Sequence, residues 1–144
     1  MQNVIHLASD HAGFTLKATL TTYLTDHGYK VIDHGTGSEE SCDYPVYAHR
    51  LCAALEQEDS LGILVCGTGI GMSMAANRHA HIRAALCTTE LHARMSRRHN
   101  NANVLCLGAR VTGEGQALAI VDAFLESPYD GGRHQRRLDQ LNIK

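Results

Sequence analysis

The sequence has 144 residues, of which 44% are hydrophobic and 19% are charged, and its formal net charge is -2. This length suits one domain with a buried core, here taken as residues 1–144, and the composition excludes a disordered or collagen-like chain. Because so small a net charge attracts polyanions weakly, we expect no nucleic-acid partner.

Short apolar runs recur along the chain and predict strands. They lack a polar–apolar alternation, which is typical of strands that are buried on both faces. The predicted strands are residues 4–8, 30–32, 62–66, 84–87 and 104–107.

Segments with helical periodicity lie between these runs. The first has Leu16, Leu20 and Leu24 at helical spacing and ends at Gly28, and residues 46–57 and 114–125 show similar patterns. Strand and helix alternate five times, which predicts a parallel sheet covered by helices on both faces. The predicted fold class is therefore α/β, a single three-layer α/β/α Rossmann-like domain with a five-stranded parallel sheet.

The residues that follow the predicted strands are the first place to look for a site, because ligands bind at the carboxyl ends of open α/β sheets. Asp10-His11 follows the first strand, Cys66-Gly67-Thr68-Gly69-Ile70-Gly71 ends the third, and Gly108-Ala109-Arg110 follows the fifth. The long polar connection from residue 35 to residue 45 is a candidate rim for this site.

The glycine-rich segment 66–71 has two interpretations. Alternating glycines let backbone N–H groups approach an anion where a helix begins, or they only serve a tight turn. Nicotinamide and P-loop fingerprints fail on spacing, Met72 stands where a cysteine phosphatase needs arginine, and Leu64 excludes a nucleophile elbow.

Cys66 lies at the start of this turn, where N–H donors and a helix end favour a thiolate. A thiolate beside an oxyanion cradle suits covalent attack on a carbonyl or removal of a proton next to one. The alternative is an inert buried thiol.

Basic residues near the C-terminus supply a second candidate element. Arg133 and Arg137 are four residues apart, so a helix would place both guanidinium groups on one face to clamp a phosphate. The alternative is a solvated basic tail. His99 follows another basic run and could act as an acid or base near neutral pH.

Metal, disulfide and membrane signals are weak. The five cysteines include no C-x-x-C pair and no convincing three-ligand set appears, so we expect no catalytic metal and a reducing cytoplasmic location. The N-terminal apolar run is too short for a signal peptide or a membrane span.

Seven segments in order resemble the family of ribose-5-phosphate isomerase B, which also includes allose- and galactose-6-phosphate isomerases. The resemblance spans nearly the whole chain and implies a sheet order of 2-1-3-5-4. The segments are residues 9–14, 43–45, 66–71, 98–100, 103–105, 108–111 and 131–134.

The resemblance implies an aldose–ketose isomerase that converts ribose 5-phosphate to ribulose 5-phosphate without a cofactor. Cys66 would move a proton between C2 and C1, His99 would help to open the furanose ring, and Thr68 would assist near the reacting hydroxyls. The implied substrate-binding residues are Asp10, His11, Tyr44, Gly67, Gly69, Ile70, Gly71, Asn100, Arg110, Arg133 and Arg137.

The resemblance also implies a homodimer or a dimer of dimers with the site at the subunit interface. A C-terminal basic helix of about residues 131–142 would complete the site. A six-carbon sugar phosphate, a non-catalytic sugar-phosphate sensor and, less well, a covalent cysteine hydrolase remain alternatives.

Overall fold

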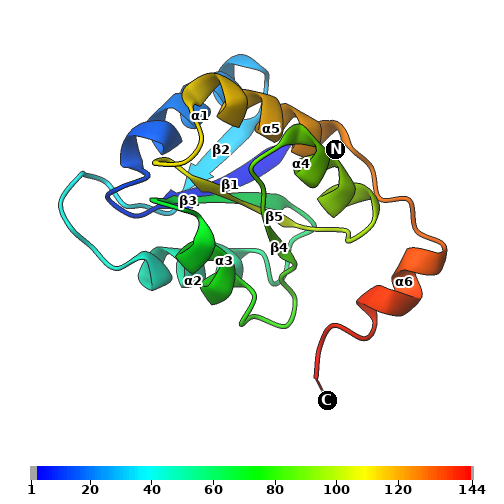
Figure 1. The fold of residues 1–144 in the computed structure, drawn as a ribbon. Helices are drawn as coiled ribbons and strands as arrows, with labels where there is room; N and C mark the ends of the chain where they lie inside the picture. The colour runs from blue at the N-terminus through cyan, green and yellow to red at the C-terminus, as the bar shows by residue number, and fades with distance from the viewer. Residues whose placement is uncertain (1–2, 144) are drawn as a thin grey trace.

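Five parallel strands form the centre of the structure, a computed structural model that describes residues 3–143. The strand order is β2-β1-β3-β5-β4, which confirms the order implied by the family resemblance (Figure 1). The strands are β1 (Val4–Ser9), β2 (Lys30–Asp33), β3 (Leu61–Cys66), β4 (Ala84–Leu86) and β5 (Val104–Gly108).

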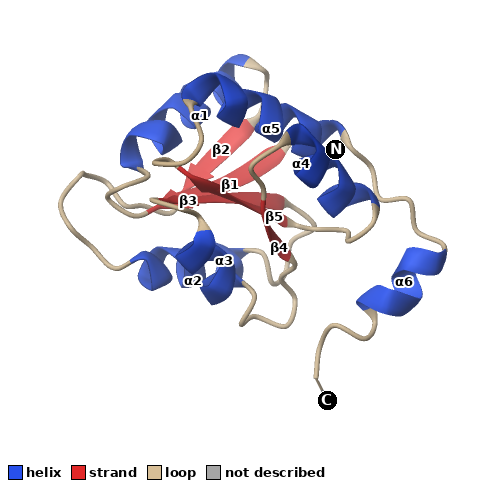
Figure 2. Cartoon of the chain, viewed as in Figure 1, coloured by secondary structure: helices blue, strands red, loops and turns tan. Residues whose placement is uncertain are grey.

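Helices cover both faces of this sheet, as the alternation of patterns predicted. In Figure 2, α1, α4 and α5 lie on one face, and α2 and α3 lie on the other. The helices are α1 (Phe14–Asp26), α2 (Tyr44–Ala54), α3 (Ile70–Ala76), α4 (Glu90–Arg98), α5 (Glu114–Glu126) and α6 (Arg133–Leu138). No helix within residues 3–143 combines the length and the apolar character that a membrane crossing requires.

The register of the central strands explains why their sequences are apolar throughout. Leu7, Ile63 and Leu105 are paired across β1, β3 and β5 and belong to the core under α1 and α5. Their neighbours Leu64 and Cys106 belong to the core under α2 and α3. Since alternate side chains enter two different cores, each strand needs apolar residues at successive positions.

Two helices differ from the predicted boundaries. The helix expected at 46–57 begins at Tyr44, because Asp43 is extended and Pro45 occupies the first turn, where its missing N–H costs nothing. The basic helix expected over residues 131–142 is shorter, Arg133–Leu138, and none of its residues is buried. Gly131 and Gly132, which both have positive φ, precede it.

The topology places functional segments at opposite edges of the sheet. The segments after β1, β3 and β5 lie at the carboxyl edge, whereas the C-terminal ends of α4 and α5 return to the amino edge. Five residues of β5 separate the two edges by about 16 Å, at a rise of about 3.3 Å per residue. Figure 1 shows α6 on the side away from the arrowhead of β3.

Candidate active site

Cys66 ends β3 with a side chain that is almost fully buried, at 5% exposure of the residue. Its sulfur accepts a hydrogen bond from the N–H of Gly69 at 3.1 Å. Gly69 has a φ of +81°, and α3 begins at the next residue. A left-handed residue at this position turns the chain sharply enough to bring its own amide back to the thiol.

The next amide in the turn is also engaged. The N–H of Ile70 donates to Oγ1 of Thr68 at 3.2 Å. Two amides of the predicted oxyanion cradle therefore converge on the side chains of Cys66 and Thr68. An incoming anionic oxygen would share or displace these contacts.

Arg110 reaches the same turn from β5. The N–H groups of Ala109 and Arg110 donate to the carbonyl oxygens of Cys66 and Gly67 at 2.8 and 2.9 Å. A Cβ atom on Gly67 would lie 3.2 Å from Nη1 of Arg110, so the guanidinium group lies against the glycine backbone. The absence of a side chain at residue 67 lets a permanent positive charge lie against the turn that follows Cys66.

Asp10 and His11 approach from the end of β1. Oδ1 of Asp10 accepts the N–H of Gly13 at 3.0 Å, which holds the turn before α1. Nδ1 of His11 accepts the N–H of Cys42 at 3.2 Å and so ties this turn to the candidate rim. The carboxyl edge therefore gathers the polar groups expected there from β1, β3 and β5.

Tyr44 comes to this edge from the start of α2. A Cβ atom on Gly71 would lie 2.6 Å from the ring of Tyr44, so only glycine permits the ring to lie against α3. The structure thus places the predicted residues Asp10, His11, Tyr44, Arg110 and segment 66–71 at one edge.

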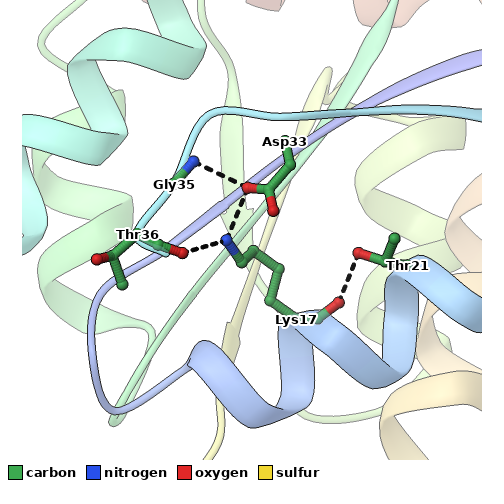
Figure 3. Close-up of polar contacts among 5 residues, drawn as sticks. All are labelled: Lys17, Thr21, Asp33, Gly35 and Thr36. Carbon is green, nitrogen blue, oxygen red and sulfur yellow. Dashed lines mark hydrogen bonds and ion pairs between the residues drawn. The ribbon is translucent and has the colours of Figure 1, made fainter. Parts of the chain in front are cut away.

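Lys17 holds the start of the rim, residues 35–45, and the sequence analysis did not identify it. Only 2% of this lysine is exposed, and its Nζ donates to Oδ1 of Asp33 at 2.6 Å and to the carbonyl oxygen of Thr36 at 2.7 Å (Figure 3). The same carboxylate oxygen accepts the N–H of Gly35 at 2.8 Å. The sequence did indicate that this lysine is buried, because Lys17 lies on the same helical face as Leu20 and Leu24.

The rim is also joined to β1 beyond the end of β2. The N–H of Ser9 donates to the carbonyl oxygen of Gly35 at 2.7 Å, and the N–H of Thr36 donates to that of Ser9 at 2.8 Å. These bonds and the Lys17 ammonium fix the segment that leads to Cys42 and Tyr44.

The remaining predicted residues lie at the amino edge. His99 is the C-cap of α4 and Asn100 follows it, while Arg133 and Arg137 belong to α6. The ring of His99 stacks on that of His134, with centroids 4.4 Å apart. Within one chain the structure therefore does not bring these four residues to Cys66.

Three other cysteines in the core have raised pKa values. Burial raises the pKa of Cys52 to about 12 and that of Cys87 to about 11. It also raises the pKa of the fully buried Cys106 thiol, to which nearby thiols add a smaller effect. These raised pKa values disfavour the thiolate form of the three thiols near neutral pH.

The carboxyl edge combines a thiol, converging amides and an arginine. Such a set can take a proton from carbon next to a carbonyl, because amide and guanidinium donors stabilise the negative oxygen that results. Covalent attack by the thiol uses the same groups.

Comparisons with known proteins define the relatives of this chain. A family model described as Ribose/Galactose Isomerase matches residues 5–141. Ribose-5-phosphate isomerase B of Escherichia coli is 47% identical over 138 residues, which cover 95% of this chain and 93% of that protein.

Solved structures agree along the same length. A ribose 5-phosphate isomerase from Thermotoga maritima is 52% identical with a TM-score of 0.94, covering 98% of both chains. Ribose-5-phosphate isomerase B from Mycoplasma genitalium with bound ribulose-5-phosphate is 41% identical with a TM-score of 0.92, covering 96% of this chain and 93% of that one.

Proposed function

The chain belongs to the ribose/galactose isomerase family, and from this premise we propose that it interconverts D-ribose 5-phosphate and D-ribulose 5-phosphate. The names of its relatives support the substrate class. The observation that carries the chemistry is the Cys66 sulfur, which accepts the Gly69 amide at the carboxyl edge, in a turn against which Arg110 lies at Gly67.

In the proposed reaction, the Cys66 thiolate removes the proton from C2 of the open-chain aldose. The electron pair moves toward the carbonyl and forms an enediolate, whose oxygens are stabilised by turn amides and the Arg110 guanidinium. Return of the proton to C1, with proton exchange between the two oxygens, gives the ketose. Because the same atoms leave and return, the reaction needs no external oxidant or cofactor.

We propose that His99 and Asn100, together with Arg133 and Arg137, come to this thiol from a second copy of the chain. These residues lie at the amino edge of their own sheet, about 16 Å from the carboxyl edge. The residues of α6 are not buried against their own chain. A dimer that joins the carboxyl edge of one subunit to the amino edge of another would complete the site.

In the completed site, His99 would donate the proton that opens the furanose ring, and His11, Arg110, Arg133 and Arg137 would receive the phosphate and nearby sugar oxygens. Asp10, Tyr44 and Asn100 would line the sugar pocket. The free thiols of all five cysteines support a reducing cytoplasm as the location.

An isomerase assay with ribose 5-phosphate, run in the presence of a chelator, tests the function. We expect turnover by the wild-type chain, a loss of at least about 100-fold in Cys66→Ala, and near wild-type turnover in the control Cys52→Ala. Wild-type turnover by Cys66→Ala would reject the base assignment.

Two further measurements separate the alternatives. Side-by-side kinetics with allose 6-phosphate test a six-carbon substrate. Deuterium exchange at C2 in heavy water tests a non-catalytic sensor, since a sensor would bind the sugar phosphate without exchange.

A further inference from the structure

Three potential metal ligands converge at the amino edge of the sheet. His99, Asp130 and His134 each offer one ligand atom, and these atoms all lie within 4.8 Å of one another. The two imidazole rings are nearly parallel, with an interplanar angle of 16°. None of the three side chains is buried within its own chain.

The turn before α6 builds this cluster. The N–H of Asp130 donates to the carbonyl oxygen of Arg98 at 3.0 Å, which docks the turn on the end of α4. Gly131 and Gly132 then adopt φ values of +68° and +60°, which turn the chain so that His134 stacks on His99. Residues more than 30 positions apart in sequence thus become neighbours.

Asp130 keeps part of its carboxylate available. Its Oδ1 accepts a hydrogen bond from Nε of Arg98 at 3.3 Å. Its second oxygen has no hydrogen-bond donor among residues 3–143. A carboxylate can therefore stay paired with the arginine and still offer an oxygen to an ion.

Two imidazoles and one carboxylate form a donor set that suits zinc and related divalent ions better than magnesium or calcium. In a tetrahedral zinc site, ligand atoms are about 3.4 Å apart, so closing the cluster requires movements of about 1–2 Å. Water would fill the fourth position.

We propose that His99, Asp130 and His134 bind a divalent transition-metal ion of the zinc class, and that this ion inhibits the enzyme. The inhibitory part rests on the proposed function, because a metal on the His99 ring would occupy the group assigned to ring opening. The ion is therefore an inhibitor and not a cofactor, and a chelator should reverse its effect.

Neighbouring charges limit the strength of this site. The guanidinium groups of Arg98 and Arg133 lie on residues next to the ligands and oppose a cation. Other groups could also take zinc, namely the Cys66 thiol, the pair Cys42–His11 and the surface pair His49–His79. The experiment has to separate these sites.

Calorimetric titration of Zn²⁺ into a Cys42→Ser/Cys66→Ser protein measures binding without the two thiols at the carboxyl edge. We expect one ion per chain, with Kd raised at least about tenfold by Asp130→Asn and by His134→Gln. His49→Ala, which disrupts the other histidine pair, is the matched control and should leave this Kd unchanged. Unchanged binding in Asp130→Asn and His134→Gln, or loss of binding in His49→Ala, would overturn the site.

The inhibitory role is measured with all cysteines intact. Zn²⁺ should inhibit the isomerase reversibly, and Asp130→Asn should keep basal activity while needing at least about tenfold more Zn²⁺ for the same inhibition. Equal sensitivity of this variant would reject the inhibitory role. If the chain shows no isomerase activity, the proposed function fails, but the calorimetry still decides the metal site.

Discussion

The N–H of Gly69 points at the sulfur of Cys66 across 3.1 Å, and Gly69 can do so because its φ is +81°. A Cβ atom on residue 69 would lie 2.5 Å from Cδ1 of Leu86 and 3.0 Å from the carbonyl carbon of Leu107. Backbone conformation and close packing both require glycine at this position.

We therefore expect the added Cβ of Gly69→Ala to displace this amide and to lower kcat about 100- to 1,000-fold, an effect comparable to losing one oxyanion donor, about 2.7–4 kcal/mol. Gly28→Ala is the control, because Gly28 has a φ of +88° and open space around it. That control should cost about 1–2 kcal/mol of stability through strain alone and retain activity. Steady-state kinetics and urea unfolding check both variants. A wild-type kcat in Gly69→Ala would contradict the proposal that the Gly69 amide stabilises the anionic oxygen.

Thiol reactivity should distinguish Cys42 and Cys66, at the carboxyl edge, from the three cysteines whose pKa values are raised. Iodoacetamide at pH 8 should modify Cys42 and Cys66 in the folded protein, whereas Cys52, Cys87 and Cys106 should react only after unfolding, because burial raises their pKa values. Peptide mass spectrometry identifies the labelled residues, and the same reaction in urea is the control. Labelling of Cys106 in the folded protein as fast as Cys42 would be inconsistent with this order.

Removal of the buried ammonium should loosen the rim. Lys17→Met leaves the Thr36 carbonyl oxygen without its donor and Asp33 without its cation, so we expect a loss of about 1–3 kcal/mol in the free energy of unfolding. Lys30→Met, at an exposed position on β2, should change stability by less than about 0.5 kcal/mol. Urea denaturation compares the two variants, and equal losses would argue against a specific role of Lys17.

Residues differ in how much the sequence reveals about them. The sequence correctly predicted that Cys66 and Arg110 lie at one edge of the sheet, because both follow predicted strands and the alternation of elements implies a parallel sheet. Lys17 was missed because a lysine on an apolar helical face contradicts its usual exposure, and its partners come from a distant loop. The sequence pattern could not place His99 relative to Cys66, because in the proposed dimer that relationship depends on a second subunit and not on local pattern.

Stability should depend on His34 below neutral pH. Nδ1 of buried His6 and Nε2 of His34 are 2.8 Å apart, and Nε2 of His6 is 2.8 Å from Oε2 of Glu58. Burial and the nearby His6 lower the pKa of His34, so the unfolded chain binds its proton more readily than the folded chain. Stability is therefore lost as pH falls below about 6.5, the ordinary histidine pKa, toward the lowered value.

Thermal unfolding between pH 8 and pH 5 measures this effect. His34→Gln should show a shallower fall in Tm over this range than the wild type, and His92→Gln, at an exposed position on α4, should follow the wild type. The hydrogen bond from His6 lowers the pKa of Glu58, so that carboxylate loses its stabilising effect only at lower pH. If Tm depends on pH identically in His34→Gln and in the wild type, protonation of His34 does not cause the loss of stability.

The proposed site, shared between two subunits, predicts complementation between two inactive proteins. Cys66→Ala removes the proposed base, and Arg137→Ala removes a proposed phosphate ligand on α6, so each homodimer should be inactive. In a mixed dimer, one site would contain Cys66 from one chain and Arg137 from the other, and the second site would lack both. The mixed dimer is purified through a different tag on each chain. It should recover about half of the wild-type kcat, because one of its two sites is intact.

A site formed within a single chain would predict the opposite result, that the mixed dimer stays inactive. If Cys66 and Arg137 of the same chain formed a site, every site in the mixed dimer would carry one substitution and remain inactive. Arg136→Ala, also exposed on α6, replaces Arg137→Ala in the control dimer and should be active even as a homodimer. Because α6 buries none of its residues against its own chain and lies at the edge opposite Cys66, we expect recovery.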